Sequence, residues 1–186
     1  MPPFPVILAS GSPQRKELLE RLGIEFEIKV SGVDEIVHGD PEEVVLANAL
    51  LKARAVADDG SIVIGCDTDV VVEDHMIGKP KDEVRAREYL AQLSGRVHRV
   101  FSGLAVIGPG ADQSRTGAEV TEVRFRDLTS HEIDRYLASG EWKGRSGGYA
   151  IQGRGSALVA GIEGDLSNVI GLPVGLLLDL APELGA

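Results

Sequence analysis

The stretch that decides the fold is SIVIGCDTDVVVE, residues 61–73. Apolar, mostly β-branched residues fill both of its halves, which predicts a buried strand, while Asp67 and Thr68 interrupt its middle with polar groups. A carboxylate where an apolar strand meets polar residues is a common position for a metal ligand or a general base. The alternative is a turn aspartate that only bonds to its local backbone.

Strand-like and helix-like segments alternate on both sides of this stretch. Apolar or alternating runs predict further strands at 6–9, 26–30, 97–108 and 118–128, the last as an antiparallel partner of the strand before it. Amphipathic or apolar segments predict helices at 13–22, 41–58, 82–93, 130–139 and 173–184. The pattern predicts an α/β fold with a mixed, twisted sheet flanked by helices, as one domain over residues 1–186.

Length and composition exclude several classes of protein. A chain of 186 residues with 43% hydrophobic residues can bury a full core, and one cysteine, Cys66, excludes an internal disulfide. A formal charge of −10 argues against broad binding to a nucleic acid polymer. No apolar run is long enough for a membrane helix, and MPPFPVILAS lacks the basic start of a signal peptide, so we expect a cytoplasmic protein that binds no membrane.

The segment 140–172 is dense in glycine, with nine glycines, and a long loop of this kind is more often functional than idle. Within it, residues 144–148 read GRSGG and match GxSxG, the nucleophile motif of serine hydrolases. That motif needs a strand before the serine, a helix after it and a histidine later in the chain. The last histidine, His131, precedes Ser146, which argues against serine hydrolysis.

Polar and basic residues gather where the first helix begins, in the stretch LASGSPQRKELLERLG, residues 8–23. Serine hydroxyls, backbone N–H groups and a guanidinium there predict a phosphate-binding turn, formed by Ser10, Ser12, Arg15 and Lys16. The alternative is that Arg15 and Lys16 turn into solvent and pair with acids such as Glu20.

Other charged residues complete the set of groups that phosphate chemistry needs. Asp34 and Glu35 are candidate partners of Asp67 for one cation, although each also suits a solvated loop. Lys52 lies in a largely apolar helix and Lys79 in a turn, where lysines usually reach water. Cations for a polyphosphate, and acids for Mg²⁺ and for an attacking water, together suggest phosphoryl chemistry.

Nine segments then occur in the order and approximate spacing of a known family, from residue 6 to about residue 178: LASGSPQRKELL, VDE, LLKARAVA, VIGCDT, GKP, LSGRVHRVFSGLAV, VRFRDLTSHEIDRYLASGE, SGGYAIQGRG and SNVIGLPV. The chain resembles the Maf family of nucleoside triphosphate pyrophosphatases, which have a house-cleaning role. The resemblance implies two lobes around a deep cleft, as in the inosine triphosphatases. It also implies hydrolysis of a nucleoside triphosphate to the monophosphate and pyrophosphate with Mg²⁺ or Mn²⁺, and a homodimer.

The resemblance assigns roles to individual residues by position. Asp67 would accept the proton of the attacking water, and Glu35 would hold the metal, with Asp67 as a second ligand. The triphosphate would be bound by Ser10, Arg15, Lys52 and Lys79. Ser12 of the predicted phosphate-binding turn is a further substrate-binding candidate.

Three further positions sort substrates within the family, and here they are Gln14, Thr68 and Gln152. Thr68 and Gln152 match the branch that acts on dTTP and UTP, whereas Gln14 replaces its arginine. An amide can bond a base edge but carries no charge, so Gln14 leaves the preferred base open. A nucleotide-binding regulator of cell division that does not turn over its ligand is the alternative from another class.

Overall fold

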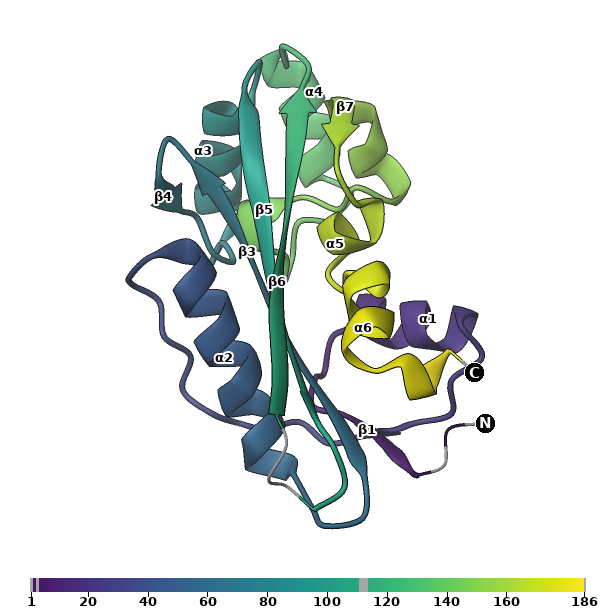
Figure 1. The fold of residues 1–186 in the computed structure, drawn as a ribbon. Helices are drawn as coiled ribbons and strands as arrows, with labels where there is room; N and C mark the ends of the chain where they lie inside the picture. Colours follow the sequence, from purple (N-terminus) through teal and green to yellow (C-terminus); the bar gives the residue numbers. More distant parts are fainter. Residues whose placement is uncertain (1, 3, 111–113, 186) are drawn as a thin grey trace. The chain divides into compact units, whose positions relative to one another are not determined.

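A computed structural model describes residue 2 and residues 4–110 and 114–185 (Figure 1). The strands are β1 (Val6–Leu8), β2 (Glu27–Ile28), β3 (Ile62–Val72), β4 (His75–Met76), β5 (Val97–Ile107), β6 (Ser114–Phe125) and β7 (Val159–Glu163). The helices are α1 (Pro13–Arg21), α2 (Pro41–Val56), α3 (Glu83–Leu93), α4 (Ser130–Leu137), α5 (Leu166–Ile170) and α6 (Val174–Leu180). Three short 3₁₀ helices are η1 (Ser146–Gly148), η2 (Gly153–Leu158) and η3 (Pro182–Leu184).

The seven strands form one mixed sheet. Its order is β2-β1-β3-β5-β6-β7, and β4 pairs with β3 beside this path. Strand β1 is parallel to β2 and to β3, whereas the pairs β3–β4 and β6–β7 are antiparallel. The predicted α/β class with a mixed sheet is therefore confirmed. Strands β5 and β6 are neighbours as predicted, and the direction of that pair stays a prediction.

The sequence missed some elements. The glycine-dense segment 140–172 contains strand β7 and helix α5 besides its turns, and a short hairpin follows β3 to form β4. The expected strand 26–30 shrinks to two residues, and both of them are exposed rather than alternating. Short strands at an edge carry too few residues for a period to show.

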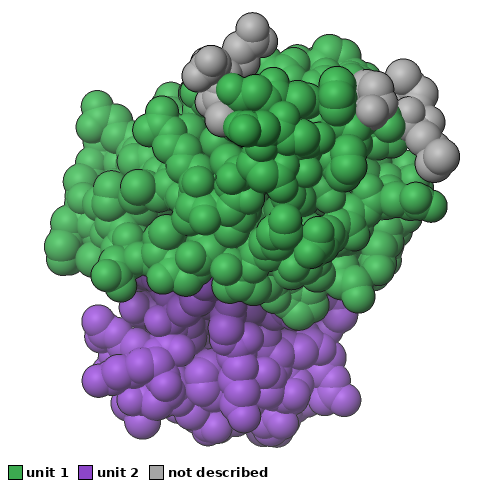
Figure 2. All heavy atoms as spheres, turned by 90° about the horizontal axis from the view of Figure 1, so that it is seen from below, with its two compact units in different colours: residues 1–68, 102–119, 171–186 green, residues 69–101, 120–170 purple. Residues whose placement is uncertain are grey.

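The chain divides into two compact units, coloured separately in Figure 2. The first unit comprises residues 1–68, 102–119 and 171–186, and the second comprises residues 69–101 and 120–170. Each unit has its own buried hydrophobic core. The deep cleft that the family resemblance implies stays a prediction.

The first unit has three layers, because successive residues of its strands face opposite sides of the sheet. Leu8 and Ile64 pack on one side with Leu19 of α1 and Leu177 of α6. Ile7, Val63 and Ala105 pack on the other side, against α2, through Ala49 and Ala53. Helix α2 begins as predicted at Pro41, where the Asp40 carboxylate accepts hydrogen bonds from the backbone N–H groups of Glu42 and Glu43.

Two glycines bring α2 against the sheet more closely than any side chain would permit. A Cβ at Gly65 of β3 would lie 2.1 Å from the carbonyl oxygen of Ala49, and one at Gly103 of β5 would lie 2.2 Å from that of Val45. Both are backbone atoms within a helix, which cannot move aside as a side-chain end can. Glycine at these two positions therefore sets how closely α2 approaches the sheet.

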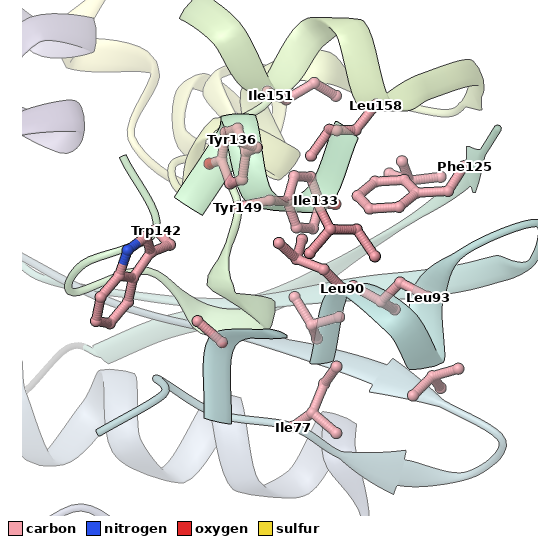
Figure 3. Close-up of a cluster of buried hydrophobic side chains, with 14 of the residues drawn as sticks. Ile77, Leu90, Leu93, Phe125, Ile133, Tyr136, Trp142, Tyr149, Ile151 and Leu158 are labelled. Atoms are coloured by element: carbon pink, nitrogen blue, oxygen red, sulfur yellow. The ribbon is translucent and has the colours of Figure 1, made fainter. Parts of the chain in front are cut away.

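The second unit is built around a cluster of buried aliphatic and aromatic side chains (Figure 3). Phe125 and Tyr149 meet edge to face with centroids 4.8 Å apart, and His98 lies edge-on to both rings. The imidazole is 2% exposed; its Nε2 shares a 2.8 Å hydrogen bond with the Tyr149 hydroxyl, and its Nδ1 finds no hydrogen-bond partner among the described residues. Burial lowers the pKa of His98 to about 4 and raises that of Tyr149.

None of the helices in the described part of the chain combines the length and the apolar character that a membrane crossing requires.

Replacing Gly65 with alanine should lower the free energy of unfolding by about 1–3 kcal/mol or more, because α2 must shift to accommodate the methyl group. The matched control is Gly175→Ala in helix α6, where a Cβ meets nothing within 4 Å. That change should leave stability unchanged or raise it by about 0.5–1 kcal/mol, since alanine favours a helix. Urea unfolding measures both variants, and equal stabilities would contradict the close-packing argument.

Acidification should destabilise the protein through His98. Its folded pKa of about 4 lies below the ordinary 6.5, so the unfolded chain binds more protons between these values, and stability falls as the pH decreases through this window. The expected contribution is about 2 kcal/mol between pH 7 and pH 5. His98→Gln keeps a polar side chain but removes the titration, so urea unfolding of this variant should show a correspondingly smaller loss. Parallel pH profiles would exclude His98 as the cause.

Candidate active site

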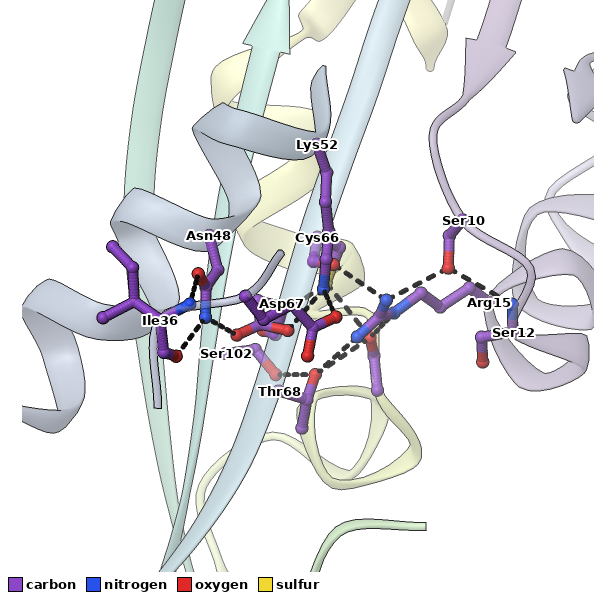
Figure 4. A network of polar contacts seen from close by, with 12 residues as sticks. Ser10, Ser12, Arg15, Ile36, Asn48, Lys52, Cys66, Asp67, Thr68 and Ser102 are labelled. Atoms are coloured by element: carbon purple, nitrogen blue, oxygen red, sulfur yellow. Dashed lines mark hydrogen bonds and ion pairs between the residues drawn. The ribbon is translucent and has the colours of Figure 1, made fainter. Parts of the chain in front are cut away.

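The candidate site lies within the first unit, where β3 passes beneath α2 (Figure 4). Because side chains alternate along a strand, Val63, Gly65 and Asp67 face the same side of β3. Gly65 leaves room for the helix backbone, and Asp67 lies two residues further on. The Asp67 carboxylate is thereby placed under the side chains of α2, and the residue is only 8% exposed.

Two residues of α2 hold the two oxygens of Asp67. Lys52 Nζ contacts Oδ1 at 2.6 Å, and Asn48 Nδ2 donates to Oδ2 at 2.9 Å. Asn48 and Lys52 are four residues apart, one turn and about 6 Å along the helix axis, so both reach the same carboxylate. Both residues are buried. Asp67 is therefore fixed in place by a charged and a neutral donor.

Asn48 also holds the loop that carries Glu35. Its Oδ1 accepts a 2.8 Å hydrogen bond from the backbone N–H of Ile36, and its Nδ2 donates to the Ile36 carbonyl at 2.9 Å. The adjacent Glu35 reaches Lys52, with Oε1 2.6 Å from Nζ. Glu35 and Asp67, the two predicted metal carboxylates, thus meet at one ammonium group. Asp34, the other acid of this loop, is exposed.

Arg15 is buried against the middle of β3 rather than turned into solvent. Its Nε donates to the Gly171 carbonyl at 2.8 Å, its Nη1 to Ser10 Oγ at 3.1 Å and to the Cys66 carbonyl at 2.8 Å, and its Nη2 to Thr68 Oγ1 at 3.1 Å. The guanidinium therefore joins the start of α1 to β3 and to the segment before α6. The alternative of a solvent-exposed Arg15 is wrong.

The same contacts organise the residues around Thr68. Its hydroxyl lies 2.8 Å from Ser102 Oγ on β5 and donates to the Gly171 carbonyl at 3.3 Å. Gly171 has φ +126°, a conformation that residues with a side chain rarely adopt, which turns its carbonyl toward both Arg15 and Thr68. The Cys66 thiol donates to that carbonyl at 3.2 Å, and burial raises its pKa, so it remains a neutral thiol.

The remaining residues of the predicted phosphate-binding turn lie at the start of α1. The Ser12 hydroxyl donates to Gln14 Oε1 at 3.1 Å, and the Ser12 backbone N–H donates to Ser10 Oγ at 3.2 Å. Lys16 is exposed and pairs with Glu20 across one helical turn at 3.6 Å. The solvent-paired alternative therefore holds for Lys16 but not for its neighbour Arg15.

Lys79 and Gln152 belong to the second unit. Lys79 is exposed in the turn after β4, and Gln152 is half-buried at the start of η2. In that unit the Glu141 carboxylate accepts hydrogen bonds from the backbone N–H groups of Arg154 and Gly155, which anchors the loop after Gln152. The predicted role of Lys79 toward a triphosphate and that of Gln152 toward a base stay predictions.

The serine hydrolase alternative does not fit the local structure. Ser146 begins the three-residue turn η1 and follows further turns, whereas the nucleophile motif needs a strand that leads into a helix. His131 lies in α4, ahead of Ser146 in the chain. The GRSGG match is a glycine-rich turn.

Glu35 and Asp67 have the chemistry that a hard divalent cation requires. Carboxylate oxygens are preferred ligands of Mg²⁺, which usually takes one or two of them and completes its shell with water and substrate phosphate. The two carboxylates already converge on one positive group, Lys52 Nζ. In the described part of the chain no group of three or more His, Cys, Asp or Glu residues forms a metal cluster. The residues present thus fit a cation that shares its coordination with a phosphate ligand.

Sequence reasoning missed Asn48, Ser102 and the Gly171 carbonyl. Asn48 had a usable signal, because it is a polar residue one turn before Lys52 in a largely apolar helix. Ser102 lies in an apolar strand without any such pattern, and a backbone carbonyl carries no signal in the residue types.

A buried carboxylate paired with a lysine, on a mixed α/β sheet with a buried arginine nearby, is a set of groups that suits a phosphorylated ligand. Comparison with known proteins is more specific: the family model described as Maf-like protein matches residues 5–184. The chain belongs to this family.

Three similar proteins come from Bacillus species. The chain is 48% identical over 177 residues to a dTTP/UTP pyrophosphatase of Bacillus cereus (strain ATCC 10987 / NRS 248), which covers 93% of this chain and 86% of the relative. Proteins of the same name from Bacillus thuringiensis subsp. konkukian (strain 97-27) and Bacillus anthracis are also 48% identical, over 93% of this chain and 92% of their own length.

Asn48→Leu should lower the free energy of unfolding by about 1–3 kcal/mol, because it deprives Asp67 Oδ2 and the Ile36 backbone of their partner. Leu51→Ala on the same helix, at a side chain that is 40% exposed, is the control and should change stability by no more than about 0.5 kcal/mol. Urea unfolding compares the two. An Asn48 variant as stable as the control would show that the three hydrogen bonds contribute nothing net.

Proposed function

We propose that this protein is a nucleoside triphosphate pyrophosphatase that hydrolyses dTTP and UTP to the monophosphate and pyrophosphate. The observation that carries the proposal is the Asp67 carboxylate, buried beside Glu35 and bonded to Lys52 and Asn48. The names of relatives at 48% identity support the same activity. The functional unit would be one domain over residues 1–186, acting as a homodimer in a cytoplasmic house-cleaning role.

Asp67 would act as the general base in this reaction. One carboxylate oxygen would accept a proton from the water that attacks the α-phosphorus, and the bond from that phosphorus to the bridging oxygen of pyrophosphate would break. Asn48 orients the carboxylate through its other oxygen. Lys52 would hold the negative charge of the triphosphate, together with Ser10, Ser12, Arg15 and Lys79.

Glu35 and Asp67 would hold Mg²⁺ or Mn²⁺. When bound, the metal would supply a Lewis acid that neutralises charge on the phosphate oxygens. Either ion would serve, since oxygen ligands suit both Mg²⁺ and Mn²⁺.

The preference for a pyrimidine base would depend on Gln14, Thr68 and Gln152. Thr68 is already bonded to Arg15 and lies beside Ser102, so it would act on the ligand from a fixed position. Gln14 accepts a hydrogen bond from Ser12 at the start of α1, which ties it to the serines of the predicted phosphate-binding turn. An amide there offers both a donor and an acceptor to a base edge.

Wild-type protein should release pyrophosphate from dTTP and UTP in preference to CTP, GTP and 7-methyl-GTP, and only with a divalent metal. Asp67→Asn should lower kcat about 10²–10⁴-fold, since the amide cannot accept the proton. Asp59→Asn, at an exposed loop position, is the matched control and should keep wild-type turnover.

Near wild-type turnover by Asp67→Asn would remove the residue from its role as base. Binding of dTTP without release of pyrophosphate by the wild type would instead favour the regulator that does not turn over its ligand. A preference for another base would make Gln14 the residue to replace first.

A further inference from the structure

Lys52 contacts both carboxylates that are proposed to bind the metal, although Lys52 itself is proposed to bind the triphosphate. Its ammonium contacts Glu35 Oε1 and Asp67 Oδ1, each at 2.6 Å, while its side chain is only 10% exposed (Figure 4). The same lysine is expected to bind the triphosphate, and the same two carboxylates are expected to bind the metal. A divalent cation held by these same two oxygens, Glu35 Oε1 and Asp67 Oδ1, would need the position that the ammonium now occupies between them.

From this arrangement we infer that Lys52 occupies the divalent-cation position in the free protein, and that metal and nucleoside triphosphate bind together by displacing it. The cation takes the carboxylates of Glu35 and Asp67, and the released ammonium pairs with the triphosphate. This inference rests on the proposed function, because it assumes that one site takes both ligands.

Each oxygen of Asp67 accepts from one donor, Lys52 at Oδ1 and Asn48 at Oδ2. A metal ion on this carboxylate would bring a second positive charge next to the ammonium, so it competes with Lys52 and not with the neutral amide. Asn48 is the donor that stays. It makes three hydrogen bonds, to Asp67 and to both backbone groups of Ile36, and it is 2% exposed. Its short side chain cannot leave Asp67 without also losing the loop that carries Glu35.

Lys52 is the donor that leaves. Its four-carbon stem has several rotatable bonds, and an ammonium finds an equivalent partner in phosphate oxygens. A divalent cation also satisfies two converging carboxylates better than a single positive charge does, since each carboxylate then faces twice the charge.

The exchange makes the binding of the two ligands cooperative. Without nucleotide, a metal ion must displace Lys52 with no new partner for the ammonium, so metal binding is weak. With nucleotide present, the triphosphate receives the ammonium as the metal takes the carboxylates. By linkage the metal raises the affinity for nucleotide by the same factor. The free protein thus keeps its carboxylates neutralised until the complete substrate complex arrives.

Replacing Lys52 with methionine should therefore move the two affinities in opposite directions. Lys52→Met keeps the length of the side chain and removes the competing charge, so the free protein should bind Mn²⁺ about 10-fold tighter or more, within the usual range of coupling between ligands. The variant should bind a dTTP analogue with an imido group between the α- and β-phosphorus about 10-fold more weakly. Isothermal titration calorimetry measures both affinities, first with Mn²⁺ alone as the probe and then with the analogue in saturating Mn²⁺, where the ammonium of the wild type is released from the carboxylates.

Lys29→Met is the matched control. Lys29 also lies in the first unit and is close to two carboxylates, Glu27 at 3.7 Å and Asp58 at 3.6 Å, but on the surface. Lys29→Met loses the same single positive charge as Lys52→Met, so any general effect of net charge on Mn²⁺ binding appears in both variants. The inference is overturned if Lys52→Met binds Mn²⁺ no tighter than the wild type or than Lys29→Met.

A second measurement uses only the wild-type protein, in case Lys52→Met does not fold. Reductive methylation followed by mass spectrometry reports how accessible each lysine is. Saturating Mg²⁺ without nucleotide should raise the labelling rate of Lys52 several-fold and leave that of Lys29 unchanged. An unchanged rate at Lys52, with Mg²⁺ bound, overturns the inference.

Failure of the inference is distinguishable from failure of the proposed function. Mn²⁺ binding and lysine labelling need no turnover, whereas the proposed function stands or falls on pyrophosphate release by the wild type. A wild type that releases pyrophosphate, together with a Lys52→Met variant of unchanged Mn²⁺ affinity, rejects only the displacement of Lys52.

Discussion

Helix α2 lies so close to strands β3 and β5 that no side chain fits between its backbone and theirs at Gly65 and Gly103. This contact determines the position of everything that acts on Asp67. A helix held further from the sheet would carry Asn48 and Lys52 away from a carboxylate that they now meet at 2.9 and 2.6 Å. The geometry of the candidate site is therefore a consequence of how two glycines pack, and neither glycine touches the site chemistry.

The polar groups of the site form two networks that share β3. In one, Asn48 and Lys52 hold Asp67 and the loop at Glu35. In the other, Arg15 ties Ser10, Thr68 and Gly171 together, so most of the donors of its guanidinium are already used by the protein. Buried charges of this kind need partners, and several of the partners here, such as Ser10, Thr68 and Glu35, are residues with a predicted role toward the ligand. Substrate binding in this family member would then exchange internal pairs for pairs with phosphate and metal.

In this protein one residue can both be a candidate ligand-binding group and hold segments of the fold together. Arg15 was a candidate phosphate ligand or a solvated surface residue, and the structure shows a third arrangement in which it is a buried tie between segments. Lys16, its neighbour, is the solvated residue that pairs with Glu20. Two adjacent cations at the start of one helix thus have different environments because only one of them faces the sheet.

The sequence by itself determined the longer strands and helices and the kinds of chemical group that the site contains. Apolar and helical patterns located β3, β5, α2 and α3 to within a few residues. Asp67 and Lys52 were each recognised as a group suited to phosphate chemistry, without any sign that they meet. Only the tertiary structure decided which groups meet. Residue types say what a side chain can donate or accept, whereas Asn48, Ser102 and the Gly171 carbonyl join the site through contacts between segments 19 to 156 positions apart in the chain. Such contacts depend on how closely a helix can approach a sheet, and that is set by packing rather than by local pattern.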